Sequence, residues 1–274
     1  MEVVFERCCG LDVHKATVVA CLWIRDQAGK VHKEIQTFGT MMMDLLVLYD
    51  WLKAKGVTHV AMESTGVFWK PIYNLLEDDF QVLLVNAEHI KRVPGRKTDV
   101  TDCEWIADLL AHGLLKASFI PPKPIRELRD LTRYRKSLID ERVREMNRLH
   151  KLLQAANLKL SSVASDVMGM SGRRMLEALL EGQTDPEVLA DLAKGKLRKK
   201  LPELKKALHG RFNPHHRFLL EHILSHLDFL DATIEKISEE VATRTAPFDR
   251  LIQLMDTIPG VDRKVAEATI AEIG

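Results

Sequence analysis

The N-terminal part of the chain alternates short apolar runs with amphipathic segments. Apolar or β-branched runs between turn residues predict strands, whereas apolar positions repeated every three or four residues predict helices. The expected strands are Cys8–Asp12, Thr17–Arg25, Val31–Phe38, Val57–Met62 and Phe80–Val85. The expected helices run from a Thr40 cap to Lys55, over Val67–Glu77, and from Asp99 to His112. Three strands followed by helix, strand, helix, strand and helix is the order of a ribonuclease-H-like α/β domain, which we expect over residues 1–118.

After three prolines near residue 121, the pattern becomes helical. Two long amphipathic stretches, Ile125–Leu158 and His215–Thr245, carry apolar residues at helical spacing. They are expected to pair as an antiparallel coiled coil, within one chain or between two, although each is equally compatible with an ordinary helical bundle. Shorter helices are expected at Ser171–Leu180 and Asp185–Ala193. Residues 119–250 are therefore expected to form an α-helical coiled-coil region for nucleic-acid binding and oligomerisation.

The last segment, residues 251–274, resembles the start of a helix-hairpin-helix domain. Its Ile258-Pro259-Gly260-Val261 turn leads into a helix at Lys264–Ile273. Such a turn presents backbone N–H groups to a phosphate, but Asp262 stands where glycine is common. DNA contact and a purely structural turn both remain open, and we expect this domain to be incomplete.

Composition describes an ordinary globular protein, with 46% hydrophobic and 29% charged residues. The chain has neither a signal-peptide pattern nor an apolar run of about 18 residues, so we expect a cytoplasmic protein without a membrane span. Its four cysteines lack CxxC spacing and are expected to be reduced core thiols.

The net charge of +1 conceals a strong segregation of charge. Residues 36–112 hold 7 Lys/Arg and 11 Asp/Glu, residues 121–160 hold 11 and 5, and residues 194–211 hold 8 and 1. An acidic region beside two basic segments fits a polyanionic partner, although solvated helix faces are also often basic.

Four carboxylates stand in three short motifs: Asp12 in GLDVHK, Glu63 in MESTG, and Asp99 and Asp102 in KTDVTD. The first two follow strand-like runs, and the last two are spaced i, i+3 on an expected helix, which puts both on one face. Gathered carboxylates repel one another and favour a hard divalent cation, as in two-metal phosphodiester chemistry. Taken singly, each also has a structural interpretation, such as an acidic residue in the first turn of a helix.

These motifs, with the run RKTDVTDCEWIA at residues 96–107, resemble those of the DEDD transposases. These are insertion-sequence recombinases related to the pilin-gene invertase Piv, many of them guided by a bridge RNA. The resemblance implies a RuvC-like domain that binds Mg²⁺, with Mn²⁺ as a substitute, through catalytic Asp12, Glu63, Asp99 and Asp102. It also implies DNA, guide RNA and a homo-oligomer, dimer or tetramer, as partners.

The resemblance further implies a serine nucleophile in a C-terminal domain. No serine of this sequence matches that motif, so we expect a C-terminally truncated chain that is inactive alone. Two other functions stay open: a metal-dependent nuclease or Holliday-junction resolvase, and a non-catalytic nucleic-acid-binding assembly protein.

Basic side chains near the acidic motifs and along the first long helix are candidates for holding nucleic-acid phosphates. Few aromatic residues lie among them, so we expect contacts to the backbone or to structured RNA rather than base stacking. These candidates are Lys15, Arg96, Lys97, Arg126, Arg129, Arg133, Arg135, Arg142, Arg144, Arg148, Lys199 and Lys200.

Overall fold

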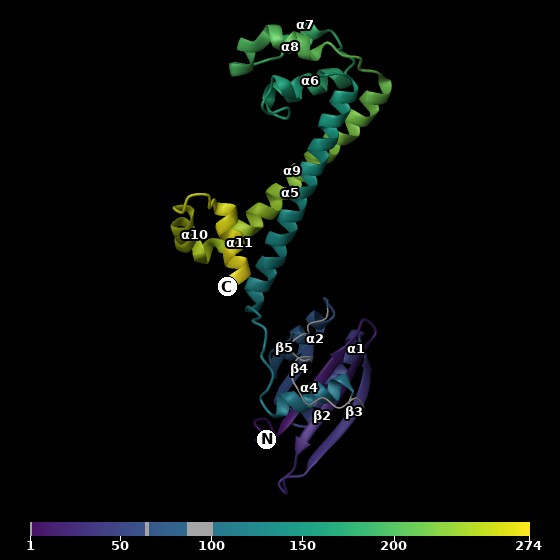
Figure 1. The fold of residues 1–274 in the computed structure, drawn as a ribbon, viewed down its shortest axis with the longest axis vertical. Helices are drawn as coiled ribbons and strands as arrows, with labels where there is room; N and C mark the ends of the chain where they lie inside the picture. The colour runs from purple at the N-terminus through teal and green to yellow at the C-terminus, as the bar shows by residue number, and fades with distance from the viewer. Residues whose placement is uncertain (1, 64–65, 87–100) are drawn as a thin grey trace. The chain divides into compact units, whose positions relative to one another are not determined.

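The computed structural model describes residues 2–63, 66–86 and 101–274. The chain divides into two compact units, residues 1–120 and 121–274 (Figure 1). Among the described helices, none is long and apolar enough to cross a membrane.

The first unit is built on a five-stranded mixed sheet in the order β3-β2-β1-β4-β5. β1 pairs antiparallel with β2 and parallel with β4, β2 pairs antiparallel with β3, and β4 pairs parallel with β5. The strands are β1 (Arg7–Val13), β2 (Thr17–Arg25), β3 (Val31–Gly39), β4 (His59–Glu63) and β5 (Gln81–Val85). All five expected strands are therefore present, within two residues at either end.

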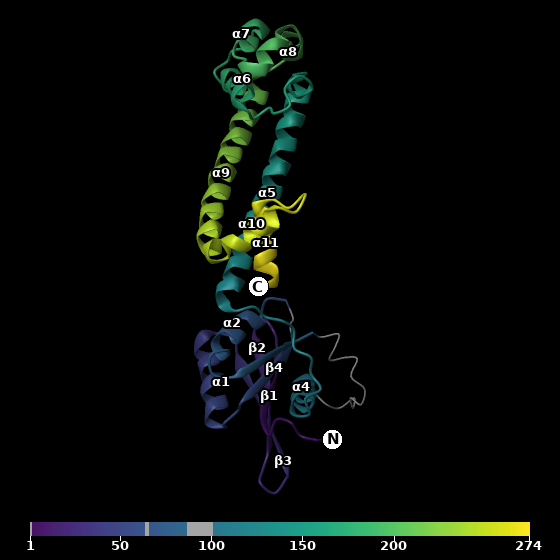
Figure 2. The same cartoon turned by 90° about the vertical axis from the view of Figure 1, so that its left-hand side faces the viewer.

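Helices cover both faces of this sheet (Figure 2). On one face, α1 (Met42–Ala54) and α2 (Trp69–Leu76) bury leucines such as Leu48 and Leu76 against alternate strand residues, including Leu11 and Met62. On the other face, α4 (Asp102–Ala111) packs on a second core that contains Cys8, Trp23 and Ala61. Because strand side chains alternate between faces, Gly10 and Asp12 share the α4 face with Cys8.

Gly10 permits a backbone-to-backbone contact between β1 and α4. A Cβ at this position would lie 2.3 Å from the Cys103 carbonyl oxygen and 2.5 Å from the Ala107 nitrogen. Two further bonds anchor the same helix on the sheet: Trp23 Nε1 donates to Asp108 Oδ1 at 2.9 Å, and Lys33 Nζ donates to Asp108 Oδ2 at 2.6 Å. The absence of a side chain at Gly10 and the Asp108 carboxylate, which accepts from both Trp23 and Lys33, thus set the position of α4.

Two expected helix starts are wrong. Thr40 does not cap α1, which follows an extended Met41, because the Thr40 hydroxyl instead donates to the Lys15 carbonyl oxygen at 2.9 Å. α4 begins at Asp102 rather than Asp99, since Thr101 has extended dihedral angles (φ −66°, ψ 156°). Asp99, the expected start, lies outside the described residues.

The second unit is helical. Its two long helices, α5 and α9, lie side by side and run antiparallel within one chain (Figures 1 and 2). The main helices are α5 (Lys123–Ala155), α6 (Met170–Leu180), α7 (Pro186–Asp191), α8 (Leu201–Leu208), α9 (Pro214–Thr245), α10 (Asp249–Asp256) and α11 (Arg263–Ile273). Both long helices predicted from the sequence are present, and they pair with each other within the chain.

Cores at both ends hold the helical unit together. At one end, α6, α7 and α8 pack on leucines where α5 ends and α9 begins, among them Leu149, Leu153 and Leu220. At the other, α10 and α11 pack on Leu128 and Val241, so the final segment is part of this unit.

A buried ion pair, Arg135 Nη1 to Glu267 Oε2 at 2.8 Å, ties α11 to α5, with 4% and 3% of the two side chains exposed.

Replacing Gly10 by alanine is expected to destabilise the first unit by about 1–3 kcal/mol, because α4 must shift off the sheet. Thermal unfolding measured by circular dichroism checks this. Gly39→Ala is the matched control, since its added Cβ meets only the side chain of Asp44, which can rotate away. Equal stability losses for the two variants would contradict the proposed backbone contact.

Removing the buried carboxylate by Glu267→Ala is expected to cost about 3–5 kcal/mol of unfolding free energy, because Arg135 keeps a buried, uncompensated charge. Glu272→Ala removes the exposed partner of Arg133 and is expected to cost at most about 1 kcal/mol. Urea denaturation of both variants measures the difference, and similar costs would show that burial of the first pair has no energetic role.

Candidate active site

Asp12 and Glu63 come from neighbouring parallel strands. Leu11 of β1 is in register with Met62 of β4, so the following residues, Asp12 and Glu63, are adjacent positions at the carboxyl ends of both strands. Asp12 shares a face with Gly10, and Glu63 shares one with Ala61, which packs against α4. Both carboxylates therefore belong to the sheet face that α4 covers.

Asp102 is the first residue of α4 and is exposed. The next residue, Cys103, gives the carbonyl oxygen that lies against Gly10, so the first turn of the helix passes beside β1 two residues before Asp12. The helix start is defined by Glu104, whose carboxylate accepts from the Thr101 hydroxyl at 2.7 Å and from the Thr101 N–H at 3.2 Å. The hydroxyl bond is the main cause of the lowered pKa of Glu104.

The fourth predicted carboxylate, Asp99, lies outside the described residues, as do Arg96 and Lys97. In the part of the chain that is described, no group of three or more His, Cys, Asp and Glu side chains is arranged to hold a metal ion. The structure places Asp12 and Glu63 on one face at the carboxyl ends of adjacent strands, and Asp102 begins the helix that packs on that face. Carboxylate oxygens are the donors that hard divalent cations prefer, so the chemistry of this set fits such an ion.

His14 is a neighbour of the candidate site to which sequence reasoning gave no role. Its Nε2 lies 3.2 Å from Asp12 Oδ2, with 60% of the His14 side chain and 21% of the Asp12 side chain exposed. The i, i+2 spacing at the strand end was the available signal, since such residues share a face. Lys15 is exposed in the turn after β1, at the same sheet edge.

The four cysteines are buried and free. Burial raises the pKa of Cys8 to about 12 and that of Cys9 well above its ordinary value. A hydrogen bond between the Cys21 and Cys103 side chains raises the pKa of Cys21 and lowers that of Cys103 to about 7. Three of the thiols pack between the sheet and α4, which agrees with their expected role as reduced core residues.

Most of the predicted arginine stripe on α5 is engaged within the second unit. Arg129 donates to the carbonyl oxygens of Ala271 and Glu272 at the end of α11, and Arg133 makes two bonds to the Glu272 carboxylate at 2.7 and 2.8 Å. Arg142 pairs with Asp231 of α9. These bonds hold helices of the same chain together.

Two more arginines of the stripe have local partners: Arg148 pairs with Glu145, and Arg126 donates to the Pro121 carbonyl oxygen at 3.0 Å. Arg135 is buried against Glu267, so its assignment to nucleic-acid binding is wrong: burial withholds its guanidinium from a phosphate. Arg144 is exposed, and within the described residues it has no ion-pair partner.

In the helix-hairpin-helix-like segment, Asp262 is the N-cap of α11. Its carboxylate accepts a hydrogen bond from the Val265 N–H at 2.9 Å. This bond occupies a backbone donor that a phosphate would otherwise use, which favours the structural interpretation of the turn.

The family model described as a transposase, of the IS110-type DEDD class, matches residues 9–158, which is more than half of the chain. The match begins at Cys9 within β1 and continues through the rest of the first unit and all of α5. A search of curated proteins finds no match.

Replacing Thr101 by alanine removes the hydroxyl bond to Glu104 and is expected to cost about 1 kcal/mol of unfolding free energy at neutral pH. Because the bond lowers the pKa of Glu104 in the folded state, its contribution is present above the ordinary value of 4.5 and is lost as pH falls through the lowered value. Denaturation of parent and variant across pH 3–7 measures this. A stability difference that stays constant down to pH 3 would contradict it.

Proposed function

The chain belongs to the IS110-type DEDD transposase family, and from that premise we propose that its first unit is a RuvC-like catalytic domain for DNA strand cleavage and exchange. The observation that carries the proposal is the parallel register of β1 and β4, which makes Asp12 and Glu63 neighbours on the face covered by α4. The sheet order β3-β2-β1-β4-β5, with its antiparallel first three strands, supports a ribonuclease-H-like fold.

Transposases of the DEDD type generally use a divalent metal. We propose that Asp12, Glu63, Asp99 and Asp102 hold Mg²⁺, with Mn²⁺ as a substitute. The bound cation supplies charge that stabilises the attacking and leaving oxygens of a phosphodiester. The chain's own contribution is to fix carboxylates on two strand ends and one helix start, while His14 orients Asp12 through their 3.2 Å contact.

The proposed nucleophile is a serine supplied from outside these 274 residues. Its oxygen forms a bond to phosphorus as the bond to a sugar oxygen breaks, and the covalent link is later transferred to another strand. The first unit's role is to bind the scissile phosphate in a fixed orientation. Lys15, exposed at the same sheet edge, is proposed to contact a neighbouring phosphate.

DNA is the proposed substrate and a guide RNA the proposed second partner, in a homo-oligomer. The exposed positive charge of the second unit supports a polyanionic partner, and Arg144 is an arginine of the α5 stripe that remains available for it.

Magnesium or manganese titration by calorimetry tests the site. The parent is expected to bind the ion, and Asp12→Asn/Glu63→Gln to bind it more than ~10-fold more weakly, because two ligand charges are removed. Asp78→Asn is the control, since this exposed carboxylate follows α2 and lies outside the candidate set. Equal binding by parent and double variant would contradict the metal site and favour a non-catalytic nucleic-acid-binding protein.

A cleavage assay separates the remaining alternatives. Incubating this chain with DNA and Mg²⁺ is expected to give no hydrolysis, because the proposed nucleophile is absent. Metal-dependent hydrolysis that disappears in Asp12→Asn would instead identify a nuclease or junction resolvase with water as the nucleophile.

A further inference from the structure

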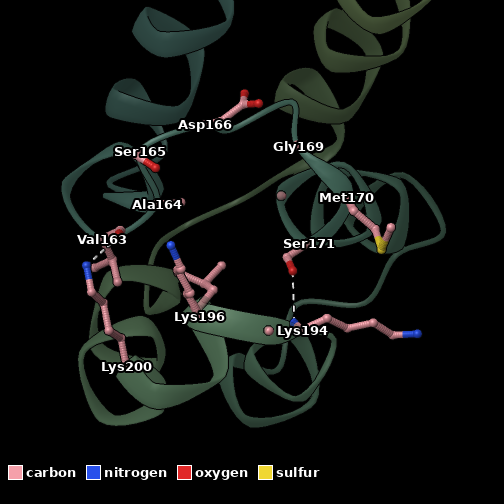
Figure 3. A pocket seen from close by; sticks show the side chains of 13 residues that line it. Val163, Ala164, Ser165, Asp166, Gly169, Met170, Ser171, Lys194, Lys196 and Lys200 are labelled. Carbon is pink, nitrogen blue, oxygen red and sulfur yellow. Dashed lines mark hydrogen bonds between the residues drawn. The ribbon is translucent and has the colours of Figure 1, made fainter.

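A cavity of about 610 Å³ lies at the end of the helical unit where α6, α7 and α8 pack (Figure 3). One wall is the segment of residues 163–166, another is the start of α6, and the third is the short helical turn η2 (Gly195–Lys200). These residues lie beyond the range matched by the family model, and the cavity lies within the second unit.

Three lysines line this cavity: Lys194, Lys196 and Lys200. All three are exposed, and Figure 3 shows the Lys196 ammonium directed into the space between the 163–166 segment and Gly169. Lys200 Nζ donates to the Val163 carbonyl oxygen at 3.3 Å, which holds it at the rim. Asp166 is the one carboxylate among the lining residues, so the cavity keeps a net positive charge.

These lysines differ from the arginines of α5 in their partners. Among the described residues, no ion pair involves Lys194, Lys196 or Lys200, whereas Arg133, Arg135 and Arg142 are paired with acids of α9 and α11. The positive charge of these three lysines is therefore not used to hold helices together. An uncompensated cluster of ammonium groups attracts an anionic partner.

Hydrogen bonds from backbone N–H groups to side-chain oxygens, together with close packing, hold the cavity walls in place. The Lys194 N–H donates to Ser171 Oγ at 2.9 Å, and the Met168 N–H donates to Asp166 Oδ1 at 2.9 Å. A Cβ on Gly172 would lie 2.1 Å from the Val167 carbonyl oxygen, so α6 is packed tightly against the preceding loop. The backbone that carries these lysines is therefore held in place around the cavity.

We propose that this cavity binds a nucleotide of a single-stranded segment of nucleic acid, with its phosphates on Lys196 and Lys200. Ammonium groups are suited to phosphate, and a volume within about 300–1,000 Å³ encloses a small ligand rather than a duplex. Unpaired nucleotides are the ones that can be turned out into a pocket. Val163, Met170 and Leu197 give the base apolar contact. The inference rests on the proposed nucleic-acid partner and gives it a second contact site, outside the carboxylate domain.

Fluorescence anisotropy with a labelled single-stranded RNA dodecamer, in EDTA and over a salt series, tests this. Lys196→Glu/Lys200→Glu is expected to raise Kd ~10-fold or more and to reduce the slope of log Kd against log salt by about 1.4, or 0.7 per lost phosphate contact. Lys196→Ala/Lys200→Ala is expected to show the same loss of slope and serves if the charge reversal unfolds the chain.

The matched control is Arg198→Glu/Lys206→Glu, which changes the same charge in η2 and the adjoining α8 at exposed residues that do not line the cavity. It is expected to raise Kd less than ~3-fold. Equal losses for the two pairs would overturn the cavity in favour of a diffuse basic surface. Adenosine monophosphate competing as strongly as the RNA would instead overturn the polynucleotide assignment.

EDTA separates this inference from the proposed catalytic site. The Asp12→Asn/Glu63→Gln variant is expected to bind the RNA as the parent does, because no metal is needed. If the parent binds and the cavity variants bind equally well, the cavity is excluded while nucleic-acid binding stands. If the parent binds no nucleic acid at all, the proposed function fails as well.

Discussion

The close approach of α4 to β1 at Gly10 is the contact on which the first unit depends. Helix and strand meet backbone to backbone, with no room for a Cβ between Gly10 and the Cys103 carbonyl oxygen. This brings the helix start beside the carboxyl end of β1, where Asp12 lies. Any side chain at residue 10 would hold α4 away from the sheet. A glycine two residues before the first acid is therefore part of the geometry of the candidate site.

The charged side chains of the second unit have different roles, which depend on how deeply each is buried. Arg135 and Glu267 lose their water on folding, and the buried charge of Arg135 is compensated by Glu267, so that pair fixes α11 on α5. The exposed pairs of Arg133 and Arg142 add orientation at small energetic gain. Lysines around the cavity remain free to exchange water for an external anion. Basic residues thus hold helices together along α5, and at the end of the unit they are proposed to bind an external anion.

The family match and the proposed chemistry rest on different parts of the molecule. The match covers residues 9–158 and identifies a transposase. The proposed metal site rests on strand register and on α4, and the proposed nucleotide cavity lies after residue 158. Two separate contacts for nucleic acid would let one unit act on a phosphodiester while the other holds a strand.

Local sequence was sufficient for the five strands and the two long helices, because period-two and helical apolar patterns reflect which side chains become buried. It also identified Asp12, Glu63 and Asp102 as the acids to examine, since each ends a strand or begins a helix. It failed at Thr40 and at the start of α4, where a bond to Lys15 and the bonds between Thr101 and Glu104 decide the backbone.

Tertiary structure alone decided which charges are paired. A row of arginines on α5 is equally compatible with binding nucleic acid and with holding other helices. For Arg135, the structural role follows from its bond to Glu267, which lies 132 residues away in the sequence. The cavity lysines likewise become a site only when the loop before α6 folds against η2. Sequence determines the residue types and their local periodicity, whereas burial and partnership depend on contacts between segments far apart in the chain.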